Sequence, residues 1–101
     1  MVKHIILWTL NPELSEEKKS EVKQGIKAGL EALREVVDGA IDITVNIDGR
    51  LDSSNCDVML DSSFTSVDSL KAYACHPAHL KVANENVRPY TIQRVCLDYE
   101  C

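Results

Sequence analysis

The chain lacks an apolar run long enough to cross a membrane. Its longest run, from Ile5 to Trp8, is far shorter than the roughly 20 residues that a spanning helix needs. It also lacks an excess of positive charge, since 11 Lys and Arg stand against 16 Asp and Glu, for a net charge of −5. Nucleic acids and anionic membranes are bound through basic surfaces, so neither is expected as a main partner. No repeat, linker or low-complexity segment is visible, and we expect one domain, residues 1–101.

The cysteines lack the spacing of a disulfide scaffold or a zinc site. They are Cys56, Cys75, Cys96 and Cys101, and no C-x-x-C pair occurs. A chain of this size can bury a core without disulfides, so we expect free thiols. No small-residue cleavage site follows the apolar run near the N-terminus, and we expect a cytoplasmic protein. Cys75, His76 and His79 are potential metal ligands, but no matching pair stands elsewhere, so no metal and no cofactor are predicted.

Hydrophobic periodicity predicts four strands and two helical regions. The predicted strands are residues 2–10, 40–47, 56–64 and 90–100, and the predicted helices are residues 15–37, 66–75 and 77–87. Ser15 and Ser66 are good N-caps, and Pro77 is suited to the first turn of a helix, so it divides the second helical region in two. The order β-α-β-β-α-β predicts an α+β fold of the ferredoxin-like type, with an antiparallel four-stranded sheet and helices on one face.

The predicted helices carry stripes of mainly apolar residues that should face the sheet. The predicted inward residues are Val22, Ile26, Leu30, Leu33 and Val37 in the first helix, Val67, Leu70 and Tyr73 or Ala74 in the second, and Leu80, Ala83 and Val87 in the third. Gly25 and Gly29 cost helix stability. They would either let the first helix approach the sheet closely or leave room for a ligand, and the sequence does not choose.

The first and last strands carry apolar residues on both faces. Those expected to face away from the helices are Ile5, Leu7, Val95, Leu97 and Tyr99. An apolar sheet face needs cover, and a second copy of the chain supplies it most simply. We therefore predict a homodimer through the open sheet face, in which two stacked sheets form a dimeric α/β barrel.

The segment from Tyr73 to Val82 holds the residues best suited to chemistry. His79 falls in the first turn after Pro77, where the helix dipole favours the neutral imidazole, which can act as a general base. The Tyr73 phenol could orient a carbonyl oxygen or a water. Structural roles are the alternative, with Tyr73 closing the core and His79 bonded to backbone, and His76 is expected to cap the helix through its side chain.

The pattern Tyr-x-x-His-Pro-x-His-Leu-Lys-Val over residues 73–82 resembles the signature of the stress-responsive dimeric α/β-barrel (Dabb) family. The segments 2–8 and 94–99 are similar to that family's first and last strands. The resemblance implies a dimer but no single activity. In plant polyketide cyclases of the family the matching tyrosine and histidine are catalytic, so the resemblance implies that Tyr73 and His79 could enolise a β-keto chain for aldol closure.

The same resemblance and the strand pattern together predict a ligand pocket between helices and sheet. Its predicted lining is His4, Ile6, Trp8, Val22, Ile26, Leu60 and Arg94. Val22 and Ile26 stand where the cyclases have aromatic tunnel residues, so a tunnel of that kind is not expected. Arg94 either pairs with Asp98 or binds an anionic group of a ligand.

Three functions remain open from the sequence. The first is a dimeric domain that binds a small apolar or carbonyl-containing molecule. The second is a cofactor-free acid–base enzyme of the cyclase or lyase type, with Tyr73 and His79 as catalytic residues. The third is a structural stress protein that acts as an assembly.

Overall fold

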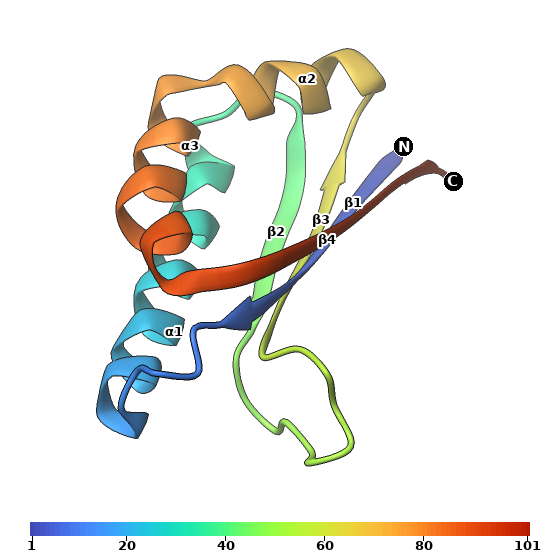
Figure 1. Cartoon of the computed structure of the whole chain (residues 1–101). Helices are drawn as coiled ribbons and strands as arrows, with labels where there is room; N and C mark the ends of the chain where they lie inside the picture. Colours follow the sequence, from blue (N-terminus) through green and yellow to red (C-terminus); the bar gives the residue numbers. More distant parts are fainter.

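The computed structural model describes residues 1–101 and has the ferredoxin-like α+β fold that the sequence predicts (Figure 1). Its strands are β1 (Val2–Leu10), β2 (Ala40–Asn46), β3 (Val58–Phe64) and β4 (Thr91–Glu100), and its α-helices are α1 (Glu16–Glu31), α2 (Val67–Cys75) and α3 (Pro77–Val82). The strands pair antiparallel in the order β2-β3-β1-β4. The two termini lie side by side, because β1 and β4 pair along their whole lengths.

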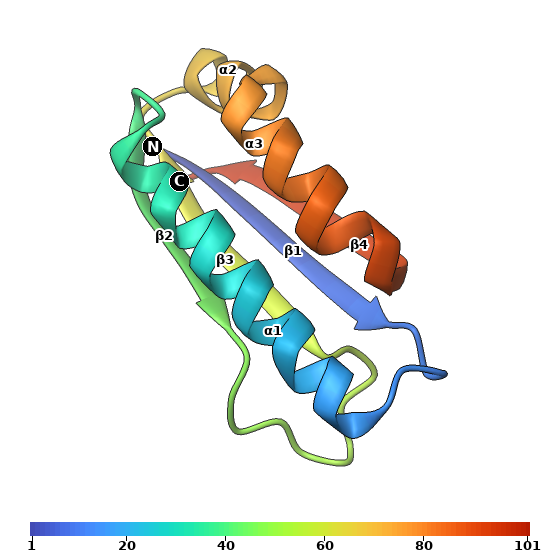
Figure 2. The ribbon, with the colours of Figure 1, turned by 90° about the vertical axis from the view of Figure 1, so that its left-hand side faces the viewer.

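The helices cover only one face of the sheet. Helix α1 and the segment that begins with α3 lie on that face, and the opposite face is bare (Figure 2). Alternation along β1 turns Ile6 and Trp8 toward the helices, and both are buried, whereas Ile5 and Leu7 face the other way and are only partly covered. The strand that looked apolar on both sides is thus buried on one side only within the chain.

The helices begin at the residues that the sequence indicates, because side chains satisfy their free backbone N–H groups. Ser15 Oγ accepts from the Lys18 N–H at 3.1 Å, and Ser66 Oγ accepts from the Ser69 N–H at 3.1 Å. His76 Nδ1 accepts from the N–H of Ala78 at 3.0 Å, which confirms its predicted role as a helix cap.

Helix α2 ends at Cys75 as predicted, but the other two helices end differently from the prediction. Regular α-helix stops at Glu31 instead of about Val37, and the chain continues as the 3-10 turn η1 (Ala32–Glu35). Similarly, α3 ends at Val82, and a π-helical turn η2 (Ala83–Val87) and a 3-10 turn η3 (Arg88–Tyr90) lead into β4. Periodicity cannot distinguish these helix types, because each keeps nearly the same residues on the buried side.

The core lies between the helices and the covered face of the sheet. The stripe on α1 and η1 is buried as predicted, at Val22, Ile26, Leu30, Leu33 and Val37. Two predicted inward residues are wrong: Val67 and Leu80 are exposed. Val67 is the first residue of α2 and Leu80 lies in the short α3, and neither belongs to the core cluster.

The face of the sheet that no helix covers has an apolar half and a polar half. The residues opposite each other in β1 and β4 are apolar, with Ile5 beside Leu97 and Leu7 beside Val95. Toward β2 the face is polar, and Asp61 of β3 lies beside Thr44 and forms an ion pair with Lys3. Only the β1–β4 half is therefore suited to an apolar contact.

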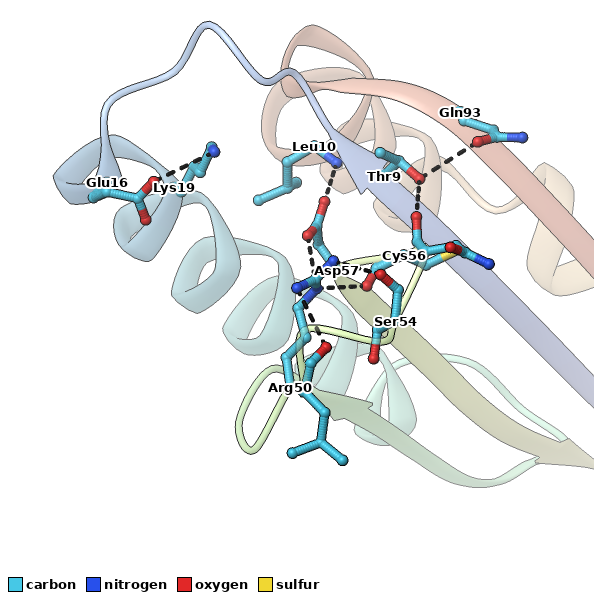
Figure 3. Close-up of polar contacts among 11 residues, drawn as sticks. Thr9, Leu10, Glu16, Lys19, Arg50, Ser54, Cys56, Asp57 and Gln93 are labelled. Atoms are coloured by element: carbon cyan, nitrogen blue, oxygen red, sulfur yellow. Dashed lines mark hydrogen bonds and ion pairs between the residues drawn. The ribbon is translucent and has the colours of Figure 1, made fainter.

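The loop between β2 and β3 is braced by an internal ion pair and joined to the end of β1 by a hydrogen bond (Figure 3). Arg50 Nε lies 3.1 Å from Asp57 Oδ1, and the Arg50 guanidinium also donates to the carbonyls of Ser54 and Cys56. Asp57 Oδ2 accepts from the Leu10 N–H at 2.8 Å. The loop is thus held by hydrogen bonds to its own backbone and to β1.

All four cysteines are free, as the sequence predicts. No helix of the chain combines the length and the apolar character needed to cross a bilayer.

Candidate functional site

A cavity of about 530 Å³ lies between the covered face of the sheet and the segment from α3 to the start of β4. Its lining residues are Ile6, Trp8, Leu30, Leu60, Tyr73, His79, Ala83, Val87, Arg88, Thr91, Ile92, Gln93 and Arg94. The apolar side chains come mainly from the sheet and helices, and the polar ones from the chain that enters β4. Such a mixture is typical of a small-molecule site.

Tyr73 and His79 meet at this cavity from opposite sides of Pro77. Their ring centroids lie 4.3 Å apart and the ring planes are inclined by 46°. The Tyr73 hydroxyl and His79 Nδ1 are both buried and neither has a hydrogen-bond partner. Buried polar atoms are nearly always paired, so two orphans beside one cavity mark a place where a ligand or water would complete the structure.

The surroundings fix the protonation state of both groups. Burial raises the pKa of Tyr73 far above its ordinary value, so the phenol stays protonated and remains a hydrogen-bond donor. Burial also lowers the pKa of His79, and the neighbouring His4, Arg88 and Arg94 act in the same direction. The backbone of Ala74 acts in the opposite direction and is outweighed. His79 is therefore neutral near pH 7 and can accept a proton.

Arg94 points into the cavity without an ionic partner. The sequence left open whether it would pair with Asp98, and it does not, because Asp98 is bonded to His4 instead. Trp8 of β1 is the cross-strand neighbour of Arg94, and both residues line the cavity. With Arg88 also at the cavity, this end of the site favours an anionic group.

His4 stands behind Tyr73 and does not line this cavity. Its ring centroid lies 6.1 Å from that of Tyr73, and its Nδ1 is hydrogen-bonded to the Asp98 carboxylate. The side chain is buried among aromatic rings and borders a second cavity, under α2, which Arg94 and Asp98 also line. Tyr73 thus separates His4 from His79.

Of the residues predicted for the pocket, Ile6, Trp8, Leu60 and Arg94 surround the same cavity as Tyr73 and His79. Val22 and Ile26 do not: both are packed in the core between α1 and the sheet, so their placement in the pocket is corrected. The cavity lies one helical turn further along α1, at Leu30. Sequence reasoning missed Leu30 because it belongs to the same buried stripe, and it missed Arg88 and Thr91 because nothing in the sequence shows that the connection to β4 closes the cavity.

The arrangement combines a neutral base, a protonated phenol and a cation around an apolar space. A base and a donor on the same side of a cavity can remove a proton next to a carbonyl while hydrogen-bonding its oxygen. Proton removal of this kind does not require a metal ion or an organic cofactor.

Comparison with known proteins places the chain in a family. Residues 2–101 match the family model described as Stress responsive A/B Barrel Domain. The comparison with curated proteins gives no match. Among solved structures, a dimeric protein of unknown function and ferredoxin-like fold from Bacteroides fragilis NCTC 9343 is 30% identical, with a TM-score of 0.91 over 99% of this chain and 95% of the other.

Two further structures resemble the chain in fold at lower identity. A Dabb family protein from Mesorhizobium loti is 13% identical, with a TM-score of 0.75 over 99% of this chain and 95% of that one. A hydroxynitrile lyase from Passiflora edulis is 19% identical, with a TM-score of 0.73 over 97% of this chain and 90% of that one. With the cavity and the paired Tyr73 and His79 in place, the full-length match to the family model identifies the chain as a member of the stress-responsive A/B barrel domain family.

Proposed function

We propose that the protein binds a small β-keto acid or related carbonyl compound in the cavity and acts on it as an acid–base enzyme. The observation that carries this proposal is the pair of unpartnered buried groups, Tyr73 Oη and His79 Nδ1, beside one cavity. The apolar part of the ligand would lie against Ile6 and Trp8, its carbonyl oxygen would accept from Tyr73, and its anionic group would meet Arg94.

In the proposed reaction His79 takes a proton from the carbon next to the carbonyl. The C–H electron pair forms the enolate, whose oxygen Tyr73 stabilises by donating its O–H. In a substrate that carries a second ketone, the enolate carbon attacks that carbonyl: a C–C bond forms, the C=O π pair moves to oxygen, and the resulting alkoxide takes the proton back from His79. Each proton and electron pair is accounted for without an external reagent.

The second candidate function is ligand binding without turnover. It is favoured by the differences from the plant polyketide cyclases, such as Arg94 in the wall of the cavity. The hydroxynitrile lyase among the structural relatives adds hydroxynitriles as a substrate class worth testing. An assembly role would need no ligand at all.

The deciding experiment is a thermal shift measurement with short β-keto acids, followed by proton exchange at their α-carbon in D2O. A ligand at about 100 times its Kd should stabilise the protein by about 2.7 kcal/mol. The fully saturated acid of equal length is the matched control ligand. Faster α-proton exchange that is lost in His79→Gln supports the enzyme, a shift without exchange supports the binding role, and no shift with any keto acid or hydroxynitrile contradicts both.

We also propose that the dimer forms through the β1–β4 half of the open sheet face. The structural relatives include dimeric ferredoxin-like proteins. In the single chain, Val95, Leu97 and Tyr99 are 48%, 60% and 44% exposed, which is unusual for neighbouring large apolar residues. A second copy stacked on this half would bury them and leave the ligand cavity on the other side of the sheet.

The cytoplasm is the proposed location, because free thiols persist in a reducing compartment. Thiol titration of freshly purified protein under denaturant should count all four cysteines. Two or more blocked thiols would contradict this location.

A further inference from the structure

A second cluster of reactive side chains lies under α2, apart from the cavity described above. Strand pairing places His4 of β1 opposite Asp98 of β4, and Ile6 opposite Cys96. His4, Cys96 and Asp98 therefore fall on the same, helix-facing side of the sheet, with their ligand atoms all within 4.8 Å of one another. No local motif marks this group, because His4 is more than 90 residues from the other two.

The distances within the cluster are close to those of a metal site. Cys96 Sγ lies 3.4 Å from Asp98 Oδ1 and 3.9 Å from His4 Nδ1, and His4 Nδ1 is hydrogen-bonded to the same carboxylate oxygen. Ligand atoms around a tetrahedral zinc ion stand about 3.3–3.6 Å apart, given bond lengths of about 2.0–2.3 Å. Only the direct contact between His4 and Asp98 would have to open, by a side-chain rotation of the exposed Asp98.

We propose that His4, Cys96 and Asp98 bind one divalent ion of the zinc type, with the fourth position open. One imidazole, one thiolate and one carboxylate form a three-ligand set that suits Zn²⁺ or Co²⁺. Mg²⁺ and Ca²⁺ are excluded, since they require about six oxygen ligands. This differs from the sequence-based expectation of no metal, which had considered only Cys75, His76 and His79, and these three do not converge in the fold.

The surroundings of the cluster permit entry and fix the ligands in place. The second cavity, of about 460 Å³, is bordered by His4 and Asp98 and reaches the surface between α2 and β4. His4 is buried and packs edge-on against the rings of Phe64 and Tyr73, so one ligand is already oriented. A thiolate and a carboxylate together neutralise a divalent ion, so the occupied site is electrically neutral beside Arg94.

The test is titration of the reduced, metal-free full chain with Co²⁺ in a phosphine reductant. A bound thiolate gives a near-ultraviolet charge-transfer band, and tetrahedral cobalt gives intense visible bands. We expect one equivalent per chain, displacement by Zn²⁺, and loss of the charge-transfer band in Cys96→Ser. Asp98→Asn should weaken the affinity by more than the roughly 10- to 100-fold cost of losing an outer-sphere partner.

The matched control is Cys75→Ser, another exposed cysteine outside the cluster, which should keep the band unchanged. Both Cys96 and Asp98 are exposed, so their variants should fold, and circular dichroism checks this. The proposal is overturned if the wild-type chain gives no thiolate–cobalt band, or if the band survives in Cys96→Ser. It is also overturned if the band disappears equally in Cys75→Ser.

Discussion

The Tyr73 and His79 rings lie 4.3 Å apart, although the two residues belong to different helices separated by Pro77. Proline at the start of α3 ends α2 and turns the chain, so the last turn of one helix faces the first turn of the next. The Tyr73 hydroxyl and His79 Nδ1 remain unpaired in this arrangement. The two rings of the site are therefore in contact, while each carries a buried polar atom that lacks a hydrogen-bond partner.

Tyr73→Phe should leave the ligand-free protein as stable as the wild type or more stable. Its hydroxyl is buried without a partner, and removing such a group recovers a desolvation cost of about 1–3 kcal/mol. The same change should weaken keto-acid binding, because the ligand loses a donor. Denaturant unfolding and ligand titration measure the two effects. A loss of stability without ligand would mean that the hydroxyl has a structural partner, contrary to the proposed role.

Stability that depends on His79 should decrease as the pH falls. The folded-state pKa lies below the ordinary value of 6.5, so the unfolded state binds the proton more readily. The contribution is therefore fully present above about pH 6.5 and is lost as the pH falls through the folded-state pKa. His79→Gln should be less sensitive to acid than the wild type over this range, in denaturant unfolding at several pH values.

The Arg94→Gln variant tests whether the charge of Arg94 contributes to the lowered pKa of His79. Because the charge of Arg94 helps to lower the pKa of His79, its removal should move that pKa upward in an NMR titration. Arg34→Gln is the matched control, since Arg34 lies outside the cavity and bonds the Ile41 carbonyl. An equal change in both variants would show that the effect is not local.

Leu97→Lys should split the proposed dimer into monomers or unfold it. A lysine in the proposed interface would place an unpaired charge against an apolar surface, at a cost of several kcal/mol, roughly. Leu51→Lys is the matched control, because Leu51 is 70% exposed in the β2–β3 loop and Leu97 is 60% exposed on the sheet. Light scattering at micromolar concentration decides the matter. A wild-type monomer, or a dimer unaffected by Leu97→Lys, would contradict this interface.

Gly29→Ala should destabilise the fold, whereas Gly25→Ala should not. A Cβ at Gly29 would stand 2.8 Å from Val82 Cγ1, so α1 and α3 would have to separate, at about 1–3 kcal/mol. At Gly25 the nearest atom is the end of the Asn86 side chain at 3.2 Å, which can move, and alanine favours the helix. A double-mutant cycle with Val82→Ala should show a coupling of about 0.5–3 kcal/mol, and its absence would place the strain elsewhere.

These glycines also resolve an alternative that the sequence left open. Neither Gly25 nor Gly29 lines the cavity at Tyr73 and His79, and neither brings α1 toward the sheet. They let α1 approach α3 and the turn that follows it. A single sequence cannot distinguish these cases, because the reason for a small residue lies on a neighbouring element.

Local features of the sequence determined the elements of this protein and the faces they present. Alternation assigned His4, Ile6 and Trp8 to one side of β1, caps at Ser15 and Ser66 began the helices, and Pro77 divided α2 from α3. Each of these depends on residues within a turn or a strand of one another, where sterics and hydrogen bonding act directly.

Tertiary structure alone decided how distant residues meet. Because of the β1–β4 register, Asp98 pairs with His4 and not with Arg94. Arg94 is therefore left without an ionic partner and lines the cavity. The position of α1 on the sheet placed Leu30 at the cavity and kept Val22 and Ile26 in the core. A shift of two residues in register, or of one turn along a helix, would change these partners while keeping the same faces buried, so the packing of the whole chain selects among them.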